Sequence, residues 1–111
     1  MIDWDRVAEL HEEIGPEDFG EVVTLFLREV EMTLSELPSC RDSPPILGEQ
    51  LHFLKGSALN LGFSALAALC ETGEATAASG AAEAVDIAAI RAAYADSRLE
   101  FLHELPVRMA A

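Results

Sequence analysis

Apolar residues recur every three or four positions along almost the whole chain, which is the spacing of amphipathic helices. No segment reads as a strand. Turn-forming residues divide the pattern into five predicted helices, approximately at residues 3–14, 17–37, 44–61, 64–79 and 82–105. Amphipathic helices joined by short loops must bury their apolar faces against one another. We therefore predict an all-α fold: an antiparallel four-helix bundle with a short extra N-terminal helix that covers one end.

The predicted helix boundaries rest largely on the prolines. Pro16 is expected to open the second helix, because its missing N–H costs nothing in a first turn. Pro38 is expected to end that helix and to leave a loop over residues 38–43. Ser43 is then a suitable N-cap for the third helix. Pro106 is expected to stop the last helix.

The chain has 111 residues, enough for one hydrophobic core, and we expect residues 1–111 to form a single domain. Cys40 and Cys70 form neither a CxxC motif nor a zinc-binding spacing. Two such thiols indicate a reduced, cytoplasmic protein. No uncharged run reaches the roughly 20 residues that a membrane span needs, so we expect no membrane association.

The charge of the chain narrows the choice of partner. Seven Lys and Arg residues against twenty Asp and Glu residues give a formal net charge of −13. Such a charge repels phosphate backbones, so nucleic acid is not an expected partner. Repulsion between like charges also disfavours self-association, and we expect a monomer. The acids are uneven, because residues 50–70 contain none and carry only one charged side chain, Lys55.

The predicted third helix has an apolar face and an unusually open face. Its apolar stripe consists of Leu47, Leu51, Leu54, Ala58 and Leu61. At about 100° per residue, His52 points about 140° away from the centre of this stripe, toward solvent. Gly48 and Gly56 lie one turn before and one turn after it, so the backbone of another molecule can approach the ring. A glycine inside a helix costs roughly 0.5–1 kcal/mol relative to alanine, which suggests that these two serve docking.

His52 and Lys55 are the predicted reactive pair on this open face. A neutral imidazole has a free lone pair with which it can attack phosphorus. Lys55, three residues further along, lies on the same surface. Its ammonium group can neutralise part of the charge on phosphoryl oxygens, which is most of what phosphoryl transfer requires.

Residues 52–62, HFLKGSALNLG, resemble the H-x-L-K-G-S-[SA]-x-x-x-G signature of histidine phosphotransfer (HPt) domains. Residues 66–71 are similar to the family's next helix. The resemblance implies that the aspartyl phosphate of a response-regulator receiver domain phosphorylates His52 on Nε2, and that His52 passes the group to another receiver. The implied partners are receiver domains and a hybrid sensor histidine kinase. The chain would be a phosphocarrier without kinase activity, and Mg²⁺ would belong to the receiver, with no cofactor or metal in this chain.

The resemblance also implies roles for individual residues. Lys55 would stabilise phosphohistidine, and Gly56 would admit the active-site loops of the receiver. Gly62 would end the third helix so that the fourth can pack against it. Family members often hold the other imidazole nitrogen with a polar side chain from the neighbouring helix. Glu71 and Glu74 are both candidates for that contact, and the sequence does not choose between them.

Gly48 and Leu59 complete the predicted docking surface. Gly48 leaves space on the N-terminal side of the histidine. Leu59 points outward close to it, so it would add apolar contact within the acid-free segment. This neutral, partly apolar patch is one that an acidic receiver pocket could tolerate.

Alternative functions account for other features of the sequence. Glu49-x-x-His52 and Glu100-x-x-His103 have the ligand spacing of di-iron carboxylate bundles, but Glu49 and His52 point away from the predicted core. Residues 55–57 lack the upstream glycine loop of a nucleotide-binding site, so we expect no kinase activity. A helical interaction module that is never phosphorylated is the main alternative to a phosphocarrier.

Overall fold

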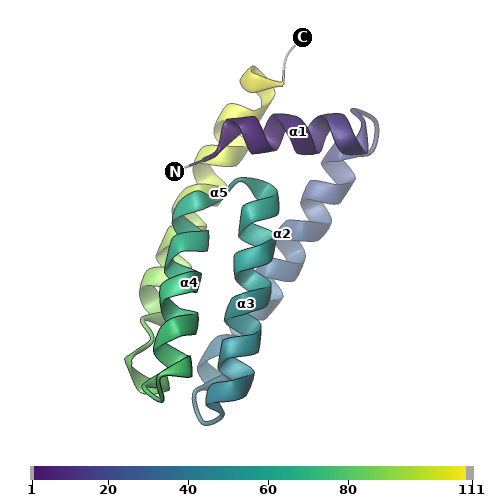
Figure 1. Ribbon diagram of the computed structural model, residues 1–111. Helices are drawn as coiled ribbons and strands as arrows, with labels where there is room; N and C mark the ends of the chain where they lie inside the picture. Colours follow the sequence, from purple (N-terminus) through teal and green to yellow (C-terminus); the bar gives the residue numbers. More distant parts are fainter. Residues whose placement is uncertain (1, 110–111) are drawn as a thin grey trace.

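The computed structural model describes residues 2–109, so residues 1, 110 and 111 of the predicted domain lie outside it. Four helices run antiparallel along the length of the molecule, and a fifth lies across one end of them (Figure 1). The described part of the chain contains no strand, only an isolated bridge between Ile2 and Phe63. The predicted all-α bundle is therefore confirmed. In chain order its elements are α1 (Trp4–Ile14), α2 (Phe19–Glu36), the 3₁₀ turn η1 (Leu37–Cys40), α3 (Pro44–Leu61), α4 (Ser64–Ala78), the 3₁₀ turn η2 (Ala82–Ala84) and α5 (Ile87–Arg108).

Apolar side chains from all five helices meet in one core. The predicted stripe of α3 is completely buried, with Leu47, Leu51, Leu54, Ala58 and Leu61 each at 0% exposure. α4 lies close against α3 because position 73 has no side chain. A Cβ atom at Gly73 would stand only 3.2 Å from Cδ1 of Leu51. This close packing brings side chains of α4 within reach of side chains on the outer face of α3.

Gly62 connects the end of α3 to α1. Its φ of +78° lies in the left-handed region, and a Cβ atom there would stand 2.6 Å from the carbonyl oxygen of Asp3. The N–H of Asp3 in turn donates to the carbonyl oxygen of Gly62 at 2.7 Å. Trp4 stacks on Phe101 of α5, with the ring centroids 5.9 Å apart. These contacts hold α1 across the end of the bundle.

α2 begins at Phe19, so the predicted start at residue 17 with Pro16 in the first turn was wrong. Residues 16–18 form a turn, because the chain must change direction between α1, which crosses the end of the bundle, and α2, which runs along it. α2 ends at Glu36. The predicted loop over residues 38–43 begins with η1, where Pro38 occupies an early position at which its missing N–H costs little.

α3 has the predicted bounds, but Ser43 does not cap it through its side chain. A capping side chain accepts a hydrogen bond from the second or third N–H of the helix. Pro44 and Pro45 occupy the first two positions, so the chain has fewer N–H groups in need of a cap. The helix therefore begins at the expected place for a different reason. α4 ends at Ala78, one residue before its predicted end.

α5 starts later than residue 82, which was its predicted first residue. Ala82–Ala84 form η2 instead, and the helix begins at Ile87. The side chain of Asp86 accepts a hydrogen bond from the N–H of Ala89 at 2.9 Å. This N-cap, which the apolar spacing alone does not reveal, marks the start of the helix.

Pro106 does not stop α5, contrary to prediction, since the helix continues to Arg108. The N–H of Met109 still donates to the carbonyl oxygen of Leu105, at 2.9 Å. The guanidinium group of Arg108 lies over the ring of Trp4, 4.7 Å from its centroid. Contact with α1 thus supports a last turn that a proline would otherwise weaken.

Within residues 2–109, none of the helices is both long enough and apolar enough to cross a membrane.

Candidate functional site

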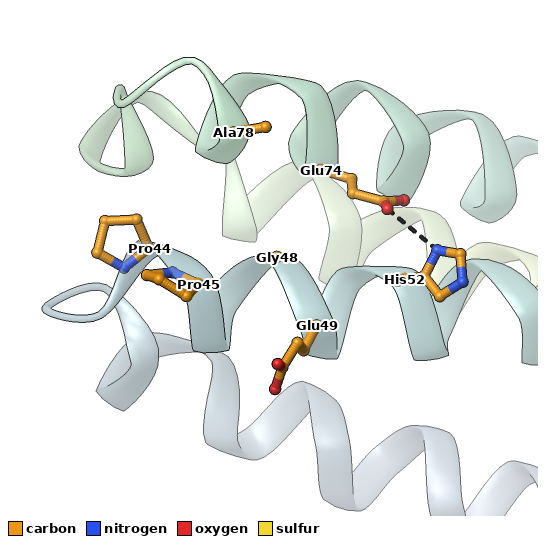
Figure 2. Close-up of a pocket in the computed structure, with 7 residues that line it drawn as sticks. All are labelled: Pro44, Pro45, Gly48, Glu49, His52, Glu74 and Ala78. Carbon is orange, nitrogen blue, oxygen red and sulfur yellow. Dashed lines mark hydrogen bonds and ion pairs between the residues drawn. The ribbon is translucent and has the colours of Figure 1, made fainter.

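His52 lies in the middle of α3 on the side turned away from the core. Its side chain is 69% exposed, whereas the stripe residues Leu51 and Leu54 beside it are fully buried. The outward direction expected from the helical spacing is the one that the structure shows. One ring nitrogen, Nδ1, faces α4, and the other lies on the side of the ring away from that helix (Figure 2).

Glu74 of α4 contacts His52, and this resolves the choice that the sequence left open. Its Oε2 atom lies 3.0 Å from Nδ1 of His52. Glu71 is exposed on the same helix and makes no such contact. An ionised carboxylate can only accept a hydrogen bond, so Nδ1 must carry the proton and donate it. The lone pair of a neutral ring is then on Nε2, the nitrogen that faces away from α4.

Lys55 contacts the same carboxylate as His52. Its Nζ atom lies 3.1 Å from Oε1 of Glu74, and its side chain is 25% exposed. The single carboxylate therefore links the imidazole and the only lysine of the chain. The cation predicted to balance phosphoryl charge is part of the surroundings of His52, half-buried between α3 and α4.

The electrostatic surroundings keep Glu74 ionised. The hydrogen bond from Lys55 is the main cause that lowers the pKa of this carboxyl below its usual 4.5. The charge of Lys55 and the contact with His52 act in the same direction, whereas loss of solvent acts against them. Glu74 is therefore available as an anion throughout the neutral range.

Cys70 lies one turn before Glu74 on α4 and is fully buried. Burial is the main cause that raises the pKa of its thiol to about 12, and the charge of Glu74 adds to this effect. A thiol that stays protonated and has no access to solvent is a poor nucleophile. Cys70 is thus part of the packing beneath the site and takes no part in its chemistry.

The two glycines beside His52 leave open space. A Cβ atom at Gly48 or Gly56 would meet no atom within 4 Å, so the fold does not require glycine at either position. Leu59 is 55% exposed on the same helix. Gly62, in contrast, is buried at the end of α3 against α1 and belongs to the fold rather than to the surroundings of the ring.

Two further apolar side chains of α3 are exposed, and neither was predicted from the sequence. Ile46 and Phe53 of α3 are 48% and 43% exposed. Both fall outside the apolar stripe of the helix, and this position was the signal that could have identified them as surface residues. Together with Leu59 they give α3 three large apolar side chains in contact with solvent. Ile46 and Phe53 share one line of the helix, whereas Leu59 lies about 120° around the helix from Phe53, on the line of His52.

A groove of about 500 Å³ opens beside His52. It starts at the prolines that begin α3 and ends at the imidazole, and Gly48, Glu49, Glu74 and Ala78 line it (Figure 2). Carbon atoms make up most of its surface. The groove could not be predicted from the sequence, because its second wall comes from α4.

The di-iron alternative does not fit this arrangement. Glu49 and His52 lie on the outer surface of α3, and no group of three or more metal-ligating side chains occurs among residues 2–109. Glu100 and His103 are on α5, where His103 is exposed. A di-metal centre needs its ligands to project together into the bundle.

Comparison with known proteins agrees with the geometry. The family model described as Hpt domain matches residues 21–105, which include His52, Lys55 and Glu74. No curated protein and no solved structure matches the chain. The match covers most of the chain, and the matched segment holds an exposed histidine on an all-α bundle. The chain therefore belongs to the Hpt domain family, whose members carry out histidine phosphotransfer in two-component phosphorelays.

Proposed function

We propose that this chain is a phosphocarrier in which His52 accepts a phosphoryl group from the aspartate of a response-regulator receiver domain and passes it to another receiver. The observation that carries the proposal is the arrangement of three side chains. His52 is exposed, Glu74 holds its Nδ1 atom, and Lys55 pairs with the other oxygen of the same carboxylate.

The transfer step follows from the protonation state of the ring. The lone pair on Nε2 of His52 attacks the phosphorus of the aspartyl phosphate, so that a P–N bond forms and the P–O bond to the aspartate breaks. The aspartate carboxylate leaves with the electron pair of that bond. The proton stays on Nδ1, and the positive charge that develops on the ring is balanced by Glu74. The reverse sequence of bond changes delivers the group to the next receiver.

Lys55 supports the same step from the neighbouring turn of α3. Its ammonium group lies beside the carboxylate that holds the ring, so it can compensate charge on the phosphoryl oxygens. The chain itself offers no cofactor chemistry in this proposal, because the Mg²⁺ ion that the reaction needs is supplied by the receiver. The protein then acts as a carrier without kinase activity of its own.

Docking of the receiver would use the open face of α3. Gly48 and Gly56 leave space for the partner's backbone on both sides of the ring. Leu59, which is exposed on the same line of α3 as His52, gives the partner carbon surface to bury. We propose a monomer that acts in the cytoplasm, with receiver domains and a hybrid sensor histidine kinase as partners.

The decisive experiment is a transfer assay with receiver domains encoded by the same genome. Each purified receiver is phosphorylated with a radiolabelled phosphoryl group and then mixed with the wild-type protein. We expect acid-labile label on the wild type and none on His52→Gln. His103→Gln removes an exposed histidine from α5 and is the matched control, so it should be labelled like the wild type. Equal labelling of His52→Gln and the wild type would refute the proposal, and binding without labelling would favour the interaction module.

A further inference from the structure

Glu49 is the one charged side chain of the groove beside His52 that has no partner within the described residues. Glu74 is engaged by both His52 and Lys55. Glu49 is exposed and makes no hydrogen bond or ion pair with any residue from 2 to 109. Its carboxylate lies on the side of α3 away from Glu74 (Figure 2). Its charge is therefore free to act on a visiting molecule.

The position of Glu49 means that a partner docked on His52 must cover it. The two residues are three positions apart, which is about 4.5 Å along a helix. Both face outward from α3 and both line the same groove. A carboxylate that loses its water without gaining a partner is costly to bury. An incoming phosphoryl group adds negative charge at the same place, so the partner must bring a positive charge to Glu49.

The groove also indicates which kind of positive group fits. The rest of its lining consists mostly of carbon atoms, which come from Pro44, Pro45 and Ala78. Gly48 adds no side chain, and the fold gives no packing reason for a glycine there. Such a surface suits a side chain with an aliphatic stem and a cationic head. Lysine and arginine have this form, whereas a bound metal ion would leave the carbon surface of the groove exposed to water.

We propose that Glu49 is a specificity-determining residue: a lysine or arginine of the receiver domain lays its aliphatic stem on the carbon surface of the groove and brings its charged head to the Glu49 carboxylate, on the side of α3 away from Glu74. This inference rests on the proposed function. It adds a chemical criterion for the partner: the receiver that uses this protein carries, on the surface around its active site, a cationic side chain that meets Glu49 when the phosphorylated aspartate meets His52.

The test compares transfer rates among charge variants with the receiver that labels the wild type fastest. Glu49→Lys should lower kcat/KM for transfer by about tenfold or more, and Glu49→Gln by a smaller factor. Glu12→Lys is the matched control, because it makes the same charge change on an exposed residue of α1 and should transfer like the wild type. Transfer to the wild type should weaken with added salt more steeply than transfer to Glu49→Gln. Circular dichroism and thermal unfolding establish that the variants are folded.

An exchange of charges between this protein and the receiver is a more specific test than the single substitutions. Each lysine and arginine on the receiver surface around the active site, but not within it, is changed in turn to glutamate, and each product is tested with Glu49→Lys. One such receiver should restore transfer to Glu49→Lys while losing it with the wild type. A Glu49→Lys protein that transfers at the wild-type rate overturns the inference and leaves the phosphocarrier function intact. A slow Glu49→Lys that no receiver variant rescues overturns it as well, whereas failure of the wild type to accept label refutes the proposed function itself.

Discussion

The Nδ1 atom of His52 lies 3.0 Å from Oε2 of Glu74, although the two residues stand 22 positions apart in the chain. The contact exists because α4 packs tightly on α3, which the absent side chain of Gly73 permits. It decides which nitrogen of the ring is protonated and which is free. The reactivity proposed for α3 is thus set by a residue of α4.

Replacement of Glu74 tests this relationship. Glu74→Gln keeps an oxygen that can accept from Nδ1 but removes the charge that balances the phosphorylated ring, and Glu74→Ala removes both. A hydrogen bond to a charged group contributes about 1.5–3 kcal/mol, so we expect Glu74→Ala to slow transfer about tenfold to a hundredfold. Glu74→Gln should fall between this variant and the wild type. Glu71→Gln is the control on the same helix, and transfer rates that do not distinguish it from Glu74→Gln would contradict the assigned role.

The lowered pKa of Glu74 predicts a pH-dependent contribution to stability. Its carboxyl has a pKa below 4.5 in the folded protein, chiefly because of the hydrogen bond from Lys55. A group of this kind stabilises the fold above its ordinary pKa and loses that contribution as the pH falls through its lower, folded value. The wild type should therefore exceed Glu74→Gln in unfolding free energy near neutrality, and the difference should shrink below about pH 4. Urea unfolding at a series of pH values measures it, and a difference that stays constant with pH would exclude the linkage.

Lys55→Ala should still fold, because the side chain is only half-buried and lies outside the apolar stripe of α3. Without the ammonium group, phosphoryl charge is less well compensated, so transfer should slow by roughly a hundredfold or phosphohistidine should hydrolyse faster. Lys55→Arg keeps the charge and should retain more activity. Rapid-quench transfer assays and the decay of isolated phosphoprotein measure the two effects. A Lys55→Ala protein with both rates unchanged would exclude any part for Lys55 in the transfer.

Substitutions at Gly56 should move stability and transfer in opposite directions. No atom lies near the space that a side chain would fill, so Gly56→Ala should stabilise the helix by about 0.5–1 kcal/mol. Gly56→Leu should also fold, but its side chain would obstruct the receiver beside His52 and reduce the transfer rate. Chemical denaturation and transfer assays on the same samples separate the effects. Wild-type transfer by Gly56→Leu would show that the partner does not use this space.

Gly62 and Gly80 provide a matched pair for the junction with α1. Both have positive φ angles, +78° and +89°, but only the Cβ atom of residue 62 would strike the carbonyl oxygen of Asp3. Gly80→Ala should cost about 1–2 kcal/mol of unfolding free energy from the backbone alone. Gly62→Ala should cost more, because α1 must also shift. Equal losses in thermal unfolding would show that the contact with Asp3 places no constraint on the residue.

Prediction from the sequence was most accurate for features that depend on a single helix. The spacing along α3 predicted its bounds and the outward direction of His52, because a single helical repeat places every residue relative to the buried leucines. The choice between Glu71 and Glu74 could not be made in the same way. It depends on how α4 is turned and how near it lies to α3, which only the packed bundle determines.

Predictions from local sequence were wrong, or could not be made, where contacts between helices determine the structure. Pro106 was expected to end α5, but Arg108 and Trp4 contact one another across helices and the last turn persists. The spacing of apolar residues likewise gave no sign that Asp86 caps the helix. The groove beside His52 could not be predicted from the sequence either, since it forms only where two helices meet.

The placement of α1 limits how the protein can be divided for study. A fragment that starts at α2 would lose the buried Val7 and the stacked indole of Trp4, and water would reach the aromatic end of the core at Phe101. Such exposed apolar surface promotes aggregation. Titrations, spectroscopy and crystallisation with receivers therefore require a chain that begins upstream of α1.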